Sequence, residues 1–175
     1  YLVSRPVPAD AFSRLLAEGT LPDGFAHRSS TVPDILIVYD DQQVARAMQR
    51  VFALHGLNAV AAASGGEALE LLAQLEIPVL LTDNRMPGMS GIELARLVKE
   101  LHPATVRIMI TGYSDVETTI RAINEGAVFK FVTRPWEDQH LCATVTEALQ
   151  YQRFLSETLK HQIPRSGETV YNEDD

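Results

Sequence analysis

The sequence predicts an α/β protein whose core is a doubly wound, five-stranded parallel sheet with helices on both faces. From residue 34 onward, short apolar runs rich in β-branched residues alternate with segments whose apolar residues recur at helical spacing. This alternation is typical of successive βαβ units. The first run, DILIVY, is almost wholly apolar, which indicates a central strand buried on both faces.

Five strands are expected, each followed by a helix. They are placed at residues 34–39, 58–62, 77–82, 106–110 and 129–132. The helical pattern after the first strand runs up to Gly56, a residue type that commonly ends helices because it tolerates positive φ. The last helical pattern, over residues 137–160, is longer than the sheet needs, and Leu155 and Leu159 continue its apolar stripe. This extension predicts a homodimer contact or a rod between domains.

Capping residues predict where the intervening helices begin. Ser64 with Glu67, and Ser114 with Glu117, match the S-x-x-E capping box. They predict the starts of the second and fourth helices. Ser90 is predicted to cap the third.

Composition narrows the class of protein. The chain has 175 residues, of which 46% are hydrophobic, so it can bury a sizeable core. Its formal net charge of -8 disfavours binding to nucleic acid, which requires clustered Lys and Arg. No apolar run approaches the roughly 18 residues of a membrane span. The single cysteine, Cys142, cannot form an internal disulfide, which indicates a reducing, cytoplasmic setting.

Polar residues stand at the carboxyl ends of four predicted strands. Asp40 and Asp41 follow the first strand, Asp83 the third, Thr111 the fourth and Arg134 the fifth. Doubly wound sheets bind ligands at this edge. Carboxylates gathered there suit Mg²⁺, and a hydroxyl with a cation can bind phosphate oxygens. The set therefore favours phosphoryl transfer to a carboxylate.

The segments that carry these residues resemble the response-regulator receiver family of two-component systems. They read ILIVYDD, LLTDNRMPGMSGIEL, IMITGYSD and GAVFKFVTRPW, and they occur in the family's order. The resemblance implies a flavodoxin-like (βα)5 fold with an extended last helix. It also implies that Asp83 accepts the phosphoryl group, that Asp40 and Asp83 bind Mg²⁺ directly, and that Arg85 lends the metal a backbone carbonyl.

The same resemblance assigns the residues that respond to phosphorylation. Thr111 resembles the switch hydroxyl, and Phe131 the aromatic residue that changes rotamer with it. Arg134 stands in the place of the phosphate-pairing lysine, ahead of Pro135, whose peptide bond is typically cis in the family.

Two positions depart from the family pattern. Tyr39 stands where the family usually has the first of two adjacent acids, which predicts weakened rather than abolished Mg²⁺ binding. Asp41 is interpreted as a solvated acid of the first helical turn, and its partial substitution for the missing acid is the alternative. Arg134 replaces a compact ammonium by a planar guanidinium, which is not a neutral exchange at a phosphate site.

The first residues point to a different family. The stretch YLVSRPVPADAFSRLL resembles the closing strand and helix of the EAL family of cyclic-di-GMP phosphodiesterases, although no catalytic EAL element is present. An unrelated N-terminal arm is the alternative. The expected division is an EAL remnant at 1–20, a linker at 21–33, the receiver at 34–154, and a helix extension with a disordered acidic tail at 155–175.

The leading functional hypothesis is a non-enzymatic phosphoacceptor domain that receives its phosphoryl group from a histidine kinase or phosphotransfer protein and regulates an attached EAL domain. One alternative is a degenerate receiver that acts as a phosphorylation-independent interaction or dimerisation module, which Tyr39 favours. A second is a metal-dependent phosphatase with an Asp nucleophile. Arg85 disfavours the phosphatase, because it stands where that chemistry places a second acid.

Overall fold

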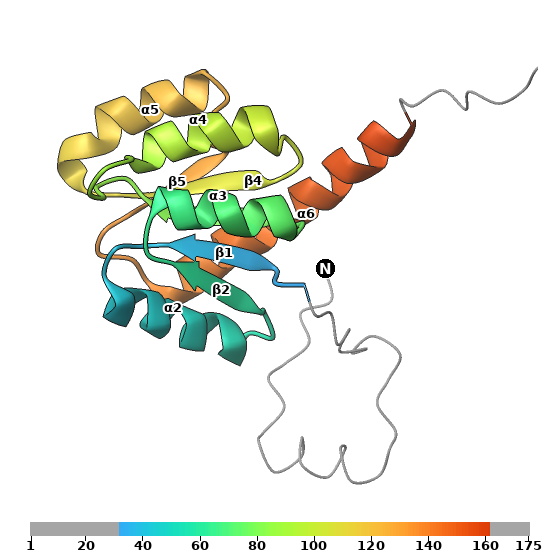
Figure 1. The fold of residues 1–175 in the computed structure, drawn as a ribbon. Coiled ribbons are helices and arrows are strands. Elements are labelled where there is room, and N and C mark those ends of the chain that lie inside the picture. The colour runs from blue at the N-terminus through green and yellow to red at the C-terminus, as the bar shows by residue number, and fades with distance from the viewer. Residues whose placement is uncertain (1–31, 162–175) are drawn as a thin grey trace, which may run out of the picture. The chain divides into compact units, whose positions relative to one another are not determined.

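The computed structural model describes residues 32–161, which contain one five-stranded sheet and five α-helices (Figure 1). The strands are β1 (Ile35–Val38), β2 (Ala59–Ala62), β3 (Val79–Asp83), β4 (Val106–Thr111) and β5 (Lys130–Thr133). The helices are α2 (Gln42–Leu54), α3 (Gly65–Gln74), α4 (Gly91–Leu101), α5 (Val116–Asn124) and α6 (Asp138–His161), with a 3-10 turn, η1 (Tyr113–Asp115), before α5. All strand pairs are parallel, in the order β2-β1-β3-β4-β5, so the predicted doubly wound sheet is confirmed.

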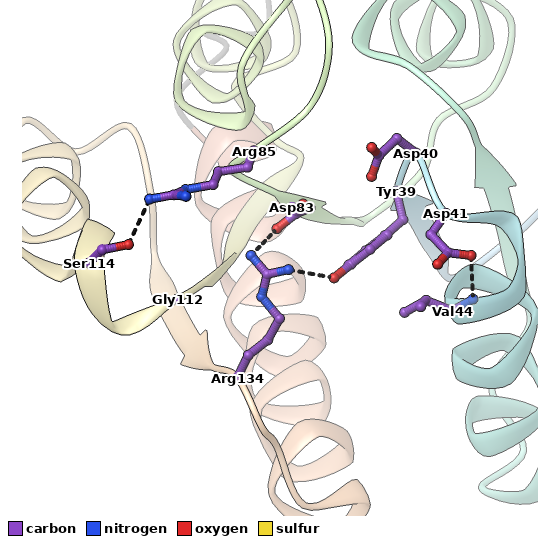
Figure 2. A pocket seen from close by; sticks show the side chains of 9 residues that line it. All are labelled: Tyr39, Asp40, Asp41, Val44, Asp83, Arg85, Gly112, Ser114 and Arg134. Atoms are coloured by element: carbon purple, nitrogen blue, oxygen red, sulfur yellow. Dashed lines mark hydrogen bonds and ion pairs between the residues drawn. The ribbon is translucent and has the colours of Figure 1, made fainter.

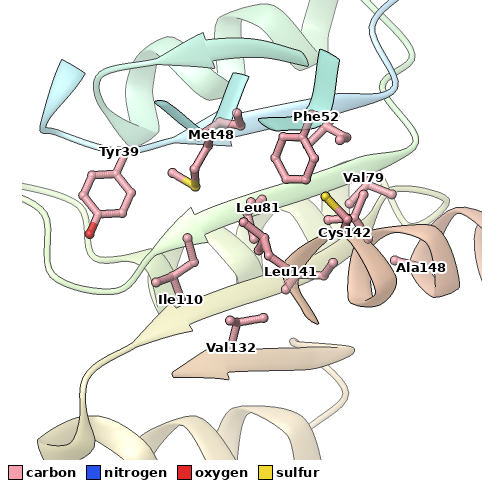
Figure 3. Packing of buried hydrophobic residues seen from close by; sticks show 14 of the residues in the cluster. Tyr39, Met48, Phe52, Val79, Leu81, Ile110, Val132, Leu141, Cys142 and Ala148 are labelled. Atoms are coloured by element: carbon pink, nitrogen blue, oxygen red, sulfur yellow. The ribbon is translucent and has the colours of Figure 1, made fainter. Parts of the chain in front are cut away.

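Helices cover both faces of the sheet. On one face, α2 and α6 pack against β1, β3, β4 and β5 through a cluster of buried apolar side chains (Figure 3). The helical members of this cluster are Ala45, Met48, Phe52, Leu141, Cys142, Val145 and Ala148. On the other face, α3 and α4 bury side chains against β1 and β3, and α4 and α5 do so against β4. The interior strand β1 is buried throughout, as its apolar sequence predicts, although β3 occupies the centre of the sheet.

The parallel register brings the strand ends to one edge. Thr82 lies opposite Val38, and Asp83 lies opposite Ile110. The loop after β3 is held close to the next helix, because the Gly91 N–H donates to the Asn84 carbonyl over 3.0 Å. A Cβ at Gly91 would overlap the Asp83 carbonyl oxygen, so only glycine lets α4 begin this near to Asp83.

Most of the predicted helix boundaries are confirmed. The Ser64 hydroxyl accepts from the Glu67 N–H and caps α3, while the Glu67 carboxylate accepts from the Ala63 N–H. Ser90 forms a complete capping box at α4. Gly56 follows α2 with a φ of 73°, the left-handed conformation expected of a residue that ends a helix.

The predicted capping box of Ser114 and Glu117 is wrong. Ser114 lies within the 3-10 turn rather than at the start of α5. Its hydroxyl accepts a hydrogen bond from Arg85 over 2.7 Å. Asp115 precedes α5, and its side chain makes no capping hydrogen bond. A tertiary contact from another loop has therefore replaced the local cap.

The extended last helix is confirmed. The exposure predicted for Leu155 is wrong, and the side chain of Leu159 lies outside the described part of the structure. Leu155 is half-buried and packs against the α2/α6 core cluster, so it does not continue an exposed stripe. Phe154 is 63% exposed. Tyr151 stacks on Phe129 with ring centroids 4.7 Å apart. The exposed aromatic surface of this helix is therefore centred on Phe154.

Several predictions lie outside the described residues. They concern the EAL-like stretch at 1–20, most of the linker at 21–33 and the tail after 161. Within residues 32–161, no helix combines the length and apolar character needed to cross a membrane.

Candidate functional site

An open cavity of about 580 Å³ lies at the carboxyl edge of the sheet (Figure 2). Its lining comes from the last residue of β3 and from residues that follow β1, β3, β4 and β5. These residues are Tyr39, Asp40, Asp41, Val44, Asp83, Arg85, Gly112, Ser114 and Arg134. The structure thus brings together the predicted site residues at 40, 83, 85 and 134.

Asp83 lies at the floor of this cavity as the last residue of β3, and it is only 2% exposed. Its Oδ1 atom lies 3.1 Å from Nη2 of Arg134, an ion-pair distance. This contact is an ion pair and does not count as a hydrogen bond, so this oxygen accepts no hydrogen bond from the described residues. Burial is the largest influence on the carboxyl and raises its pKa, while the charge of Arg134 and the Asn84 N–H act in the opposite direction. Asp83 is therefore a carboxylate that needs a cation beside it.

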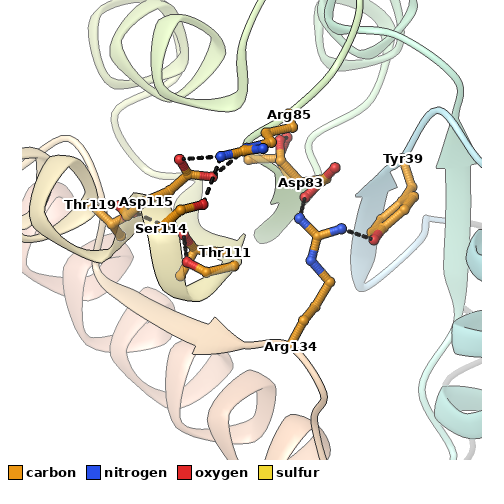
Figure 4. Close-up of polar contacts among 10 residues, drawn as sticks. Tyr39, Asp83, Arg85, Thr111, Ser114, Asp115, Thr119 and Arg134 are labelled. Carbon is orange, nitrogen blue, oxygen red and sulfur yellow. Dashed lines mark hydrogen bonds and ion pairs between the residues drawn. The ribbon is translucent and has the colours of Figure 1, made fainter.

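The Arg134 guanidinium joins two residues of the cavity (Figure 4). Nη2 contacts Asp83, and Nη1 donates a hydrogen bond of 3.0 Å to the Tyr39 hydroxyl oxygen. The Arg134–Pro135 peptide bond is cis, as the resemblance implied. Tyr39 is 5% exposed, and its ring belongs to the α2/α6 core cluster. Burial raises the pKa of its phenol, which therefore stays neutral near pH 7.

The two acids after β1 have different surroundings. Asp40 is exposed and lines the cavity. Asp41 is the N-cap of α2, and its Oδ1 accepts from the N–H groups of Gln43 at 2.9 Å and Val44 at 3.4 Å. Asp41 was expected in the first helical turn, and it instead caps that helix. Its side chain is engaged there, which makes it a poor substitute for the acid replaced by Tyr39.

The Arg85 side chain is turned away from Asp83 and bridges two loops (Figure 4). Its Nε lies 2.7 Å from Oδ2 of Asp115, and its Nη2 donates to Oδ1 of Asp115 at 3.0 Å. The bond from Arg85 is the largest influence on the Asp115 carboxyl and lowers its pKa. This bidentate pair joins the loop after β3 to the loop after β4. Sequence reasoning missed Asp115, since an acid at the end of a turn gives no signal of a partner 30 residues away.

Thr111 is fully buried at the end of β4 and is not among the residues that line the cavity. Its hydroxyl donates to the Gly112 carbonyl at 3.2 Å, and the Thr119 hydroxyl lies 3.3 Å from it. Thr119, on α5, also donates to the Asp115 carbonyl at 2.9 Å. Sequence reasoning missed Thr119 as well. Phe131 is half-buried and packs against the α4/α5 cluster, and its role as a switch stays a prediction.

The cavity offers Mg²⁺ a reduced set of oxygen ligands. Among residues 32–161, no three His, Cys, Asp or Glu side chains gather closely enough to hold a metal ion. The carboxylates of Asp40 and Asp83 share the cavity. The neutral phenol of Tyr39 takes the position at which the receiver family usually has a third acid. Mg²⁺ keeps several waters and needs only one or two protein carboxylates, so this reduced set still fits the ion.

The fold and this strand-end site define a class of small α/β signalling domains, and comparison with known proteins identifies the family. The family described as "Response regulator receiver domain" matches residues 35–146, and the chain belongs to it.

The chain is similar to curated regulators and to solved receiver structures. It is 35% identical to the hydrogenase transcriptional regulatory protein HoxA of Cupriavidus necator, over 67% of this chain and 24% of that protein. It is 37% identical to the regulatory protein AtoC of Escherichia coli, over 70% of this chain and 26% of that protein. The chain thus spans about a quarter of these relatives.

A receiver domain structure from Clostridium thermocellum matches with a TM-score of 0.67 and 26% identity, covering 71% of this chain and 99% of that one. The receiver domain of an HD domain-containing protein from Pseudomonas fluorescens matches equally well, with a TM-score of 0.67 and 29% identity over 73% and 94% of the two chains. These likenesses confirm the predicted receiver fold.

Proposed function

We propose that this receiver domain accepts a phosphoryl group on Asp83 from a histidine kinase or phosphotransfer protein and then alters its contacts with partners or attached domains. The supporting observation is the position of Asp83, which is buried at the end of β3, faces an open cavity and is paired with a cation. In the transfer step, an Asp83 carboxylate oxygen attacks phosphorus. The P–N bond of the phosphohistidine breaks, and its electron pair leaves with the imidazole.

The residues of the chain divide the remaining tasks. Asp40, Asp83 and the backbone carbonyl of Arg85 would hold Mg²⁺, which when bound neutralises charge on the phosphoryl oxygens. Arg134 already lies beside the acceptor and would pair with a phosphoryl oxygen. Thr111 has to exchange its bond to the Gly112 carbonyl for one to the phosphoryl group. That exchange would shift the population of β4 and α5 conformations.

The proposal also covers the catalytic activity, the attached domain and the partners of this chain. No hydrolytic turnover is expected of this chain. Control of an attached EAL domain is supported only by the resemblance of the first 16 residues to the end of an EAL domain. These residues lie outside the receiver match, which begins at residue 35. Cyclic-di-GMP hydrolysis by the parent protein, with and without phosphorylation, would test that control. The cytoplasmic setting, the homodimer and the lack of nucleic-acid binding stay predictions. Some longer relatives, such as NtrC of Escherichia coli, are DNA-binding regulators.

A degenerate receiver remains a second candidate, and one observation favours it. Tyr39 and Arg134 together occupy the space beside Asp83, so the resting site already has an internal cation. The two candidates are separated by treating the chain with acetyl phosphate and Mg²⁺ and measuring its mass. One added phosphoryl group on the native chain, absent from Asp83→Asn, supports the phosphoacceptor. No addition at any donor concentration supports the degenerate module.

A further inference from the structure

Both departures from the family pattern meet in one contact. Tyr39 and Arg134 are 95 residues apart in sequence, and they are joined by a hydrogen bond of 3.0 Å beside the acceptor (Figure 4). The guanidinium is a planar fork, so Nη1 can donate to the phenol while Nη2 faces Asp83. A lysine ammonium lacks this fixed fork. The two substitutions are therefore complementary parts of one arrangement.

The two partners differ in mobility. The Tyr39 ring is packed in the core, so its hydroxyl is a fixed acceptor at the cavity wall. The Arg134 side chain is 35% exposed and follows the last strand, where solvent competes for its guanidinium. Ordering a free arginine side chain costs rotamer entropy. A fixed hydrogen bond from the phenol offsets part of that cost and keeps the guanidinium beside Asp83.

Held there, the guanidinium neutralises the carboxylate at a distance of 3.1 Å. A divalent cation that approaches the same carboxylate meets a positive charge already in place, and the neutral phenol offers it no compensating attraction. Metal binding then requires Arg134 to move, which breaks its bond to Tyr39.

We propose that Tyr39 is a positioning residue that holds Arg134 as the internal counter-cation of Asp83, so that Mg²⁺ must displace this guanidinium to bind the carboxylate. This inference rests on the proposed function of Asp83. It predicts that removing one oxygen atom, the Tyr39 hydroxyl, makes Mg²⁺ bind more tightly although no metal ligand has been added.

The test is calorimetric titration of the full chain with Mg²⁺, without any phosphodonor. Tyr39→Phe is expected to bind Mg²⁺ about threefold to tenfold more tightly than the native chain, the effect of one lost hydrogen bond. Arg134→Gln is expected to bind more tightly as well. Adding Tyr39→Phe to Arg134→Gln is expected to change nothing further, because the phenol acts only through the guanidinium. Tyr113→Phe is the matched control, since Tyr113 is 80% exposed.

Three results would overturn the inference. They are equal Mg²⁺ affinities for the native chain and Tyr39→Phe, an effect of Tyr39→Phe that persists in the Arg134→Gln background, and no measurable Mg²⁺ binding by any variant. Labelling with acetyl phosphate is run beside the titration to separate the two proposals. Label on Asp83 with equal affinities removes only the positioning role. Tighter binding by Tyr39→Phe without label on any chain keeps that role and removes the phosphoacceptor.

Discussion

Replacing Tyr39 by Asp restores the acid that the receiver family usually has at this position, and the structure shows what the change costs. The Tyr39 ring is 5% exposed and packs in the α2/α6 core cluster. Truncating a buried aromatic residue typically costs about 3–5 kcal/mol. A domain of this size is stable by roughly 5–15 kcal/mol, so the variant is expected to fold with a much reduced free energy of unfolding. Repulsion by Asp83 and Asp40 adds to the loss.

Magnesium should return part of this stability. A ligand that binds only the native state at about 100 times its Kd raises the free energy of unfolding by about 2.7 kcal/mol. The new carboxylate attracts the ion, so the Mg²⁺-dependent gain should be larger for Tyr39→Asp than for the native chain. Tyr39→Asn is the matched control, because it loses the same ring and adds no charge.

The assay is urea unfolding of the three chains, each in EDTA and in excess Mg²⁺. Both variants should be destabilised by similar amounts from the loss of the ring. In Mg²⁺, Tyr39→Asp should recover more than Tyr39→Asn, which also lacks the phenol but adds no charge. Equal Mg²⁺-dependent gains for Tyr39→Asp and Tyr39→Asn would refute the electrostatic reasoning. If either variant in EDTA has the same free energy of unfolding as the native chain, the claim that the ring is part of the core is refuted.

Four further predictions follow from single side chains. Because burial raises the pKa of Asp83, the native chain should lose stability relative to Asp83→Asn as pH rises above about 3.9, the pKa of an aspartate in the unfolded chain. The difference in the free energy of unfolding between the two chains should become constant above the folded pKa. Urea unfolding from pH 3 to 7 measures this difference. Arg107 donates to the carbonyls of Thr105, Gly126 and Ala127, so Arg107→Ala should cost about 2–3 kcal/mol, while the exposed Arg121→Ala should cost little. Cys142 is buried with a raised pKa, so iodoacetamide should alkylate it slowly until urea unfolds the chain. If α6 forms a dimer, Phe154→Asp should give a monomer by light scattering without loss of stability, whereas Leu155→Asp should lower the stability itself.

The fold could be predicted from the sequence because its signals are local. The apolar run of β1 and the serine caps at Ser64 and Ser90 depend on neighbouring residues, and the structure confirms each. Ser114 shows the limit of this reasoning. Its sequence matches a capping box, but its hydroxyl accepts a hydrogen bond from Arg85, which lies in a distant loop. A local motif cannot reveal such competition.

The site could be predicted only in part, for the same reason. Strand ends place Asp40, Asp83 and Arg134 around one cavity, and parallel topology alone requires this. The hydrogen bond between Arg134 and Tyr39 has no local signal, because each residue alone is an unremarkable strand-end side chain. Thr119 likewise meets Thr111 only through the packing of α5 against β4.

Phosphorylation of Asp83 is tested most directly by one measurement. The native chain and Asp83→Asn are treated with acetyl phosphate and Mg²⁺, and intact mass and peptide mapping locate any added group. One phosphoryl group is expected on the native chain, carried by the peptide that contains Asp83, and none on Asp83→Asn. Label that persists in Asp83→Asn, or a native chain that takes no label at any donor concentration, would contradict it.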